Sequence, residues 1–191
     1  SVRDISVCTS ADNGATFTKA YSFSKDNWVV NGCPHNGPSL VCNDGNSYVT
    51  WFTGGGNGGL YYAALNKQNN ETGKEKITAT GKNVQLCLLP NKEKIIVYNV
   101  NQKLDNVFYS KISVDKIDSG KIFTMDITLP KAEASYPVVH ALNDNAVIIA
   151  WQNKNSIYYR VVDTKKITAL KANLLQASGL TAMKDEMHCG M

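Results

Sequence analysis

Two strand-like segments, separated by a polar or glycine-rich turn, occur three times in the 191-residue chain. The first copy pairs residues 47–51 with 60–63, the second pairs 94–98 with 107–110, and the third pairs 147–151 with 157–160. In each copy the earlier segment ends on an aromatic residue, Trp51, Tyr98 or Trp151. The steps from 51 to 98 and from 98 to 151 are 47 and 53 positions, close to the length of one four-stranded β-propeller blade.

Each copy is also flanked by two further segments. An apolar segment precedes it, at 38–42, 84–88 and 137–141, and a weaker one follows, at about 76–79, 123–129 and 169–175. The last of these lacks β-branched residues after Leu170 and is also compatible with a short helix. In a propeller the apolar first strand lies near the ring axis and the polar fourth strand at the rim. The pattern predicts an all-β protein, a β-propeller of four-stranded antiparallel blades at about 37–80, 82–130 and 135–176, followed by a tail at 177–191.

We expect the N-terminal residues 1–25 to form half a blade. Segments at 4–9 and about 20–24 align with the third and fourth strands of the later copies. The chain then holds about three and a half blades, whereas closed rings have about four to eight. Because closure removes exposed sheet edges, we expect either the C-terminal part of a longer propeller or two chains that complete one ring as a homodimer.

A specific turn lies between the two N-terminal segments. It contains Ser10, Asp12, Gly14, Thr16 and Phe17 in the spacing Ser-x-Asp-x-Gly-x-Thr-Phe. An Asp in a turn accepts hydrogen bonds from nearby backbone N–H groups, and Asn-Gly adopts positive φ readily. The aromatic ring is expected to fold back under the turn. The motif resembles the Asp-box, or BNR repeat, of sialidases and related propellers, in which it has a structural role away from the catalytic centre.

A second set of sequence segments strengthens this resemblance. Gly-Cys-Pro-His-Asn-Gly-Pro-Ser-Leu at 32–40, Trp-Phe-Thr-Gly at 51–54 and Gly-Leu-Tyr-Tyr-Ala at 59–63 are similar to segments of bacterial sialidase-like propellers. The resemblance covers most of residues 3–162 and implies the C-terminal part of a six-bladed sialidase-like propeller. It also implies an extracellular, periplasmic or cell-surface location, although no signal peptide is present in this sequence.

The resemblance does not imply sialidase activity. That chemistry requires three arginines for the substrate carboxylate, a Tyr nucleophile with a Glu partner, and an Asp acid/base. The chain has only Arg3 and Arg160, and the blade alignment places both near or within third strands. No catalytic residue is therefore assigned. The leading hypothesis is a non-catalytic or degenerate propeller that binds a glycan or a protein. The alternative is a glycoside hydrolase whose active site needs missing N-terminal blades.

In propellers, ligands usually bind on the face formed by the loops from strand four to strand one and from strand two to strand three. Here these loops are 26–36, 53–58, 79–82, 99–105, 131–136 and 152–155. The aromatic residues in them are expected either to stack on a sugar or to pack between blades. Carboxylates at 26, 105 and 133 are available for hydrolysis only if they converge. The ligand-binding candidates are Trp28, His35, Asn36, Thr53, Asn57 and Tyr136.

The C-terminal tail presents a different chemistry. Three of the four methionines lie in the last nine residues, beside a histidine and a cysteine. Thioether, thiolate and imidazole ligands suit Cu(I), so the tail is either a flexible terminus or a copper site. Cys33 and His35 are a second soft-metal or redox candidate, with a structural role as the alternative. The tail candidates are Met187, His188, Cys189 and Met191.

Charge and composition restrict the partners. The formal net charge of +4 comes almost wholly from scattered lysines. Nucleic-acid binding would require a basic stripe with arginines, so no nucleic-acid partner is expected. No segment is long and apolar enough to span a membrane as a helix. The odd number of cysteines, five, argues against a complete disulfide framework.

Overall fold

Antiparallel strands make up almost all the regular structure of the computed structural model, which describes residues 1–33, 35–66 and 71–171. Within these residues the strands form four antiparallel sheets, and none of the sheets is closed. The all-β class is confirmed. The strands are β1 Ser6–Val7, β2 Tyr21–Ser22, β3 Ser39–Asn43, β4 Asn46–Thr53, β5 Gly59–Leu65, β6 Glu71–Thr78, β7 Gly81–Leu88, β8 Lys94–Leu104, β9 Val107–Asp118, β10 Lys121–Asp126, β11 Ala134–Asn143, β12 Ala146–Asn153, β13 Ser156–Asp163 and β14 Ala169–Leu170, with a 3₁₀ turn, η1, at Thr164–Lys166.

Tight turns produce the meandering order within the sheets. The turns 44–45, 105–106 and 119–120 each place two consecutive residues at positive φ. Two such residues form a type I′ turn, whose twist matches that of the strands it joins. These turns connect β3 to β4, β8 to β9 and β9 to β10 in continuous register. The sequence Asp-Gly, Asp-Asn or Ser-Gly at each turn fits this geometry.

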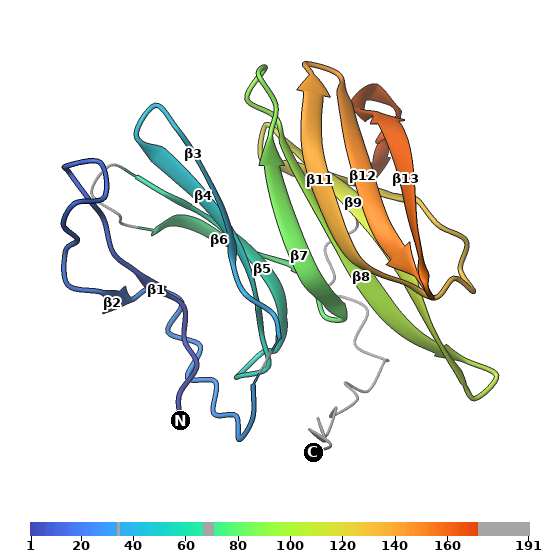
Figure 1. Ribbon diagram of the computed structural model, residues 1–191, viewed down its shortest axis with the longest axis horizontal. Helices are drawn as coiled ribbons and strands as arrows, with labels where there is room; N and C mark the ends of the chain where they lie inside the picture. The colour runs from blue at the N-terminus through green and yellow to red at the C-terminus, as the bar shows by residue number, and fades with distance from the viewer. Residues whose placement is uncertain (34, 67–70, 172–191) are drawn as a thin grey trace.

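The four sheets stack face to face in chain order (Figure 1). Because side chains alternate across a strand, one strand supplies two cores. In β5, Tyr61 and Ala63 pack toward the β1–β2 hairpin, whereas Leu60 and Tyr62 pack toward the next sheet. In β8, Ile96 and Tyr98 belong to the core shared with β3–β6. Ile95 and Val97 belong to the core shared with β11–β13.

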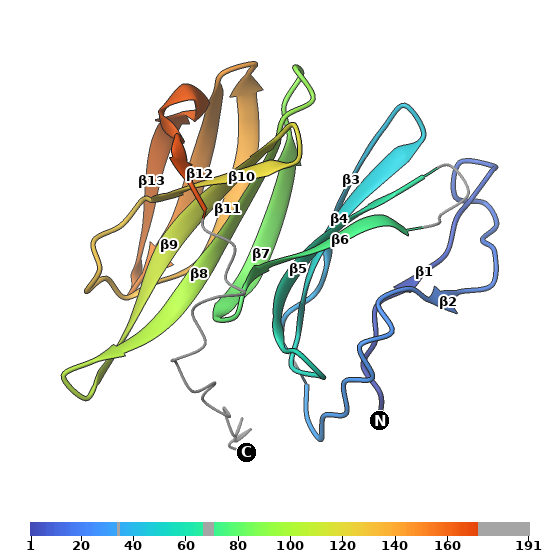
Figure 2. The same cartoon turned by 180° about the vertical axis from the view of Figure 1, so that it is seen from behind.

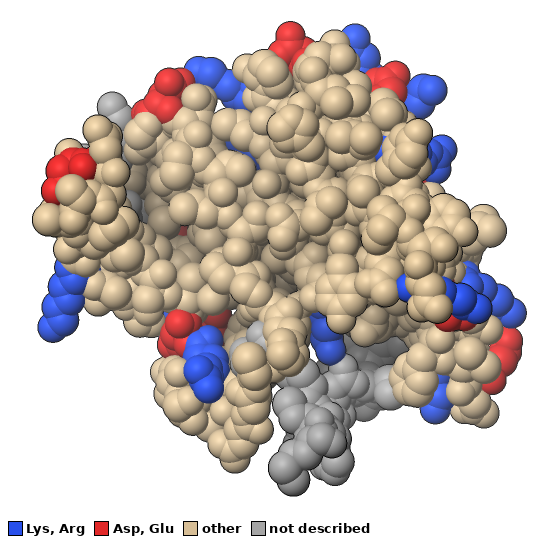
Figure 3. All heavy atoms as spheres, viewed as in Figure 1, with Lys and Arg blue, Asp and Glu red and all other residues tan. Residues whose placement is uncertain are grey.

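The two sides of the stack differ in charge. The first strands of the sheets, β3, β7 and β11, lie on the side seen in Figure 1, and the fourth strands, β6 and β10, lie on the side seen in Figure 2. Lys82 is the only Lys, Arg, Asp or Glu in β3, β7 and β11, whereas half of the residues in β6 are charged. The middle of the first-strand side is accordingly free of charged side chains, which gather around its margin (Figure 3).

The predicted Asp-box turn has the expected hydrogen bonds. Asp12 Oδ1 accepts from Thr16 N at 2.8 Å, and Asp12 Oδ2 accepts from Thr16 Oγ1 at 2.6 Å. Ser10 Oγ donates to Asp12 Oδ1 at 2.7 Å and accepts from Gly14 N at 2.7 Å. These contacts, led by the Thr16 hydroxyl, lower the pKa of Asp12 to about 2. The carboxylate therefore organises the turn.

Two expectations about the margins of the stack are wrong. Phe17 does not fold under the turn: it is 63% exposed, because the short β1–β2 hairpin offers no sheet surface beside it. The segment predicted as the fourth strand of the last sheet does not pair there either. Its described part, β14, pairs instead with β10 of the preceding sheet. In the described residues β11–β13 is therefore a three-stranded sheet, and the β7–β10 sheet gains a fifth strand.

Candidate functional site

The connections from second to third strands gather at one end of the stack, as predicted. Figure 1 shows the β4–β5, β8–β9 and β12–β13 turns at the lower end. The turns that join first to second strands, and the Asp-box turn, lie at the upper end. We call the lower end the loop end. Two groups of side chains are organised there.

The first group surrounds the glycine-rich loop after β4. Trp28 is only 8% exposed, and its ring meets Phe52 edge to face with centroids 5.5 Å apart. A Cβ atom at Gly54 or Gly55 would lie within 3 Å of Trp28, so these positions need glycine for the loop to approach the indole. The ring of Trp28 is therefore occupied by packing contacts, which favours the inter-sheet packing interpretation over a sugar-stacking platform.

A buried carboxylate orders the other side of this loop. Asp26 Oδ2 accepts from Trp51 Nε1 at 2.8 Å, and Asp26 Oδ1 pairs with Lys74 Nζ at 2.9 Å. The same ammonium group lies 4.8 Å from the Tyr61 ring centroid. Burial raises the pKa of Tyr61, and the charge of Lys74 opposes this shift. Because Asp26 is fully engaged by these partners, it has a structural role in this arrangement.

Two further binding candidates in this loop, Thr53 and Asn57, form hydrogen bonds with other residues of the chain. Thr53 is buried, and its Oγ1 accepts from Gly55 N at 3.1 Å. Asn57 accepts from Lys76 Nζ through Oδ1 at 2.8 Å and through its backbone oxygen at 3.2 Å. Burial lowers the pKa of Lys76. The exposed Asn57 remains at the surface with its oxygen engaged.

The second group is a chain of amides that crosses from the segment before β3 to the third sheet. Asn36 Oδ1 accepts from the backbone N–H of Asn83 at 2.8 Å, and Asn83 Nδ2 donates to Asn99 Oδ1 at 2.7 Å. The buried Asn99 then donates to Asn101 Oδ1 at 2.9 Å and to Ser110 Oγ at 3.1 Å. Each amide fixes the orientation of the next, so Asn101 and Ser110 are held in place.

Local backbone geometry makes this network. The register of β7 with β8 shifts between Lys82 and Gln85, and Asn83 within the shift has a φ of 51°. Asn tolerates this left-handed conformation, and a bulge re-aims the side chain it contains. The Asn83 amide consequently points along the sheet to Asn99.

The network ends at a hollow of about 330 Å³ at the loop end. Its donors and acceptors come from amide, hydroxyl and carboxylate groups, and two aromatic rings line it. Phe108 is 64% exposed, and Glu133 is the only residue of the lining with a charged side chain; it pairs with Lys154 at 3.2 Å. The hollow is lined by Asn101, Phe108, Tyr109, Ser110, Glu133 and Ser135.

The predicted binding residues are thus distributed over the loop end. Asn36 joins the amide network, and Tyr136, exposed with a φ of 51°, follows Ser135 of the hollow. Trp28, Thr53 and Asn57 belong to the glycine-loop group, and His35 is exposed beside Asn36. Asn83 was not predicted from the sequence, and Asn99 and Asn101 were expected only as part of a loop at 99–105, which the structure shows to be mostly the end of β8. The signal available for the latter two was the alternation of Asn with apolar residues in Tyr98-Asn99-Val100-Asn101.

The two arginines do not converge, and the described residues form no metal cluster. Arg3 lies before β1 and Arg160 in β13, at opposite margins of the stack, so the two guanidinium groups do not converge. The described part of the chain contains no cluster of three His, Cys, Asp or Glu side chains that could hold a metal ion. The tail candidates Met187, His188, Cys189 and Met191 lie outside the described residues. Within the described ranges no helix could cross a membrane.

Comparison with known proteins adds no assignment. No model of a known protein family matches the chain, and a search of curated proteins finds no relative.

Proposed function

We propose that the chain is a non-catalytic, sialidase-like propeller module that binds a neutral glycan in the hollow at the loop end. The observation that carries this proposal is the combination of an exposed aromatic ring with a fixed set of hydrogen-bonding groups. Sugar hydroxyls both donate and accept, so a site for them needs both kinds of partner. Asn101, Ser110 and Glu133 supply these groups, and Phe108 supplies an apolar surface for a sugar ring.

Preorganisation supports the same proposal. A ligand that orders loose side chains loses part of its binding free energy to their conformational entropy. Here Asn99 already holds Asn101 and Ser110 before any ligand arrives. The one charged residue of the lining, Glu133, is already paired with Lys154 at 3.2 Å, so the lining carries no uncompensated charge that would attract an acidic sugar. A neutral glycan, which needs donors and acceptors rather than a counter-ion, therefore suits the hollow.

The arrangement of the sheets supports the propeller part of the proposal. Four antiparallel sheets stack in chain order, and the weakly charged first strands share one side. An axis on that side and a charged rim on the other are typical of propeller blades. A ring would be completed by further N-terminal blades or by a second copy of the chain. Export to the cell surface, periplasm or medium is part of the same proposal and rests on the family resemblance.

Glycan binding is tested by a glycan array that carries neutral and sialylated oligosaccharides, followed by calorimetric titration of the strongest neutral ligand. Phe108→Ala and Asn101→Ala are each expected to weaken binding by about tenfold, from lost stacking and hydrogen bonding. Phe17→Ala is the matched control, because Phe17 is as exposed as Phe108 and belongs to the Asp-box turn, which lies at the opposite end of the stack (Figure 1). The proposal fails if no neutral glycan binds at millimolar concentration, or if the Phe17 and Phe108 variants lose affinity equally.

A further inference from the structure

Of the described strands at the fourth-strand side of the stack, β13 has the least protected outer edge. In the second sheet β6 lies beside β5, and in the third sheet β10 lies beside β9. The equivalent place beside β13 is not taken by any described strand, because β13 pairs only with β12 and β14 pairs with β10. Half of the backbone N–H and C=O groups of an edge strand point away from its neighbour and are available for pairing.

The edge of β13 also lacks the features with which proteins usually block pairing. Such edges are short, bulged, or rich in charge and proline. The outer strand β6 follows this rule: Glu71, Lys74, Glu75 and Lys76 charge it, and its register with β5 shifts twice. In contrast, β13 runs for eight residues in unbroken register with β12 and contains no proline. Its outward-facing residues are large and apolar: Ile157, Tyr159 and Val161 are 73%, 71% and 53% exposed.

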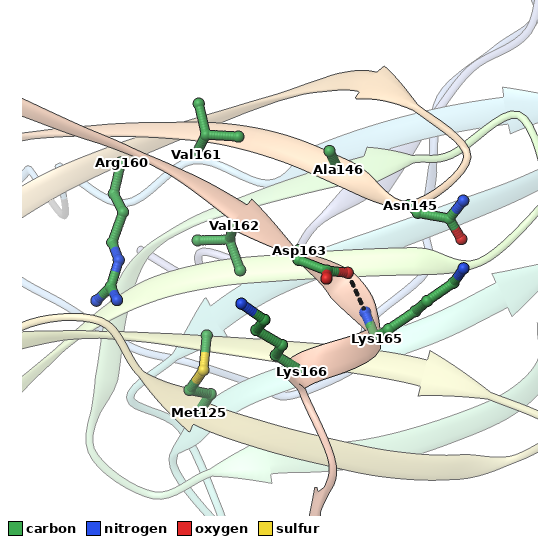
Figure 4. Close-up of a pocket in the computed structure, with 9 residues that line it drawn as sticks. All are labelled: Met125, Asn145, Ala146, Arg160, Val161, Val162, Asp163, Lys165 and Lys166. Atoms are coloured by element: carbon green, nitrogen blue, oxygen red, sulfur yellow. Dashed lines mark hydrogen bonds between the residues drawn. The ribbon is translucent and has the colours of Figure 1, made fainter.

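A hollow lies on the inward side of this edge. It has a volume of about 430 Å³ and separates β13 from β10. Figure 4 shows Met125 and Val162 along it, with the side chains of Arg160 and Lys166 reaching toward it from two sides. This is where the inward side chains of an added strand would lie.

The hollow is cationic. Arg160, Lys165 and Lys166 line it against the single carboxylate of Asp163. Asp163 Oδ1 already accepts from the backbone N–H of Lys165 at 3.0 Å. Arg160 Nη1 donates to the Ile127 carbonyl at 3.2 Å, and no carboxylate of the described residues pairs with Arg160 or Lys166.

We propose that β13 is the docking edge for an extended acidic segment of a partner protein, which adds as the fourth strand of the β11–β13 sheet. The backbone of the segment pairs with β13. Its inward acidic side chains lie between Arg160 and Lys166, and its outward apolar side chains pair with Tyr159 and Val161. A second copy of the chain does not fit, because another β13 would bring its own Arg160 and lysines to the same cationic hollow. This site shares no residue with the loop-end hollow, so it stands apart from the proposed glycan site.

The probe is a fluorescein-labelled octapeptide of alternating valine and glutamate, measured by fluorescence anisotropy against the full chain. We expect saturable binding. N-methylation of alternate amides on one edge of the peptide should abolish it, whereas methylation on the other edge should not, since only one edge pairs. A peptide with lysine in place of glutamate should bind at least about tenfold more weakly.

Protein variants test the charge contact separately from the fold. The double variant Arg160→Gln, Lys166→Gln should lose about tenfold in affinity for the glutamate peptide, and Lys166→Glu, which balances the charges of the hollow, should remove most of the preference for the glutamate peptide over the lysine peptide. Lys92→Gln is the control, because Lys92 pairs with the exposed Asp44 at the β3–β4 turn, away from β13. Circular dichroism confirms that each variant is folded.

Three results would overturn the proposal. The first is no binding at millimolar peptide, and the second is binding that ignores both N-methylation and charge. The third is a concentration-dependent dimer whose β13 amides are protected from hydrogen exchange, which assigns the edge to a second copy. Loss of glycan binding in the Phe108 variant has no bearing on these outcomes.

Discussion

A buried ion pair between Asp115 and Lys171 provides the sharpest test of how the third sheet is held together. Asp115 Oδ2 accepts from Lys171 Nζ at 2.6 Å and from Tyr98 Oη at 3.0 Å. The Asp115 side chain is fully buried, and its second oxygen, Oδ1, has no hydrogen-bond partner. Burial and then the Asp115 charge raise the pKa of Tyr98 well above its ordinary value, so the phenol stays protonated and donates.

Replacing Lys171 with Met removes the cation and leaves the carboxylate buried. Breaking a buried pair from one side costs about 3–5 kcal/mol of unfolding free energy, since the remaining charge is uncompensated. Lys171 is partly exposed, so water can reach its place, and the lower limit of about 3 kcal/mol applies. Replacing both partners, Asp115→Asn with Lys171→Met, removes both charges. The double variant should therefore lose only about 1 kcal/mol, the size of one net hydrogen bond.

Urea unfolding followed by circular dichroism measures these differences. With a slope of about 2 kcal/mol per molar urea, the Lys171→Met midpoint should fall by about 1.5 M. The exposed pair Lys92–Asp44, whose N–O distance is 3.0 Å, is the matched control, and Lys92→Met should cost less than about 1 kcal/mol. The reasoning is refuted if Lys171→Met costs no more than Lys92→Met, or if the double variant loses as much stability as Lys171→Met.

Three further predictions concern the N-terminal turn and the second sheet. The folded pKa of Asp12, about 2, lies below its ordinary value of 3.8, so its contribution to stability is present above pH 3.8 and is lost as the pH falls through 2. An NMR titration of the Thr16→Val variant should show the Asp12 pKa moving back toward 3.8. An unchanged pKa would contradict the hydrogen bond from Thr16. Gly59→Ala should lower the unfolding free energy by about 3 kcal/mol. Gly59 has a φ of 142°, and an added Cβ would lie 2.4 Å from the Thr78 carbonyl oxygen. Gly37→Ala is the control, because the space around Gly37 is open, and it should change the free energy of denaturant unfolding little. Trp51→Phe keeps most of the aromatic ring but removes the Nε1 donor to Asp26. Thermal unfolding should show that the unfolding free energy falls by about 2 kcal/mol. An unchanged unfolding free energy would mean that this hydrogen bond contributes nothing.

The repeats were the part of the fold that could be predicted from sequence. Alternating apolar residues and turn residues depend on local geometry. The three predicted pairs, whose first segments contain Trp51, Tyr98 and Trp151, therefore appear in the structure as β4–β5, β8–β9 and β12–β13. All three aromatic residues are buried. The Asp-box turn was predictable for the same reason, since its hydrogen bonds span only four residues.

Contacts between distant segments were not predictable in this way. Asn36 and Asn83 are 47 positions apart. Their hydrogen bond depends on the bulge in β7, which no local sequence pattern predicts. The exposure of Phe17 likewise depends on which sheet surface lies beside the turn. Sequence periodicity shows which face of a strand is apolar, but not which other element covers it.

The unexpected pairing of β14 and the open edge of β13 have a common physical basis. Asp115 lies in β9 and is buried between sheets, so it requires a cation from a segment that passes over β10. Lys171 reaches it only when Ala169 and Leu170 run along Thr124 and Phe123. The same two residues do not pair with β13, which lies across the 430 Å³ hollow from β10. Among the described residues, the pairing that brings Lys171 to Asp115 thus leaves no fourth strand beside β13, which is the place proposed for a strand from a partner.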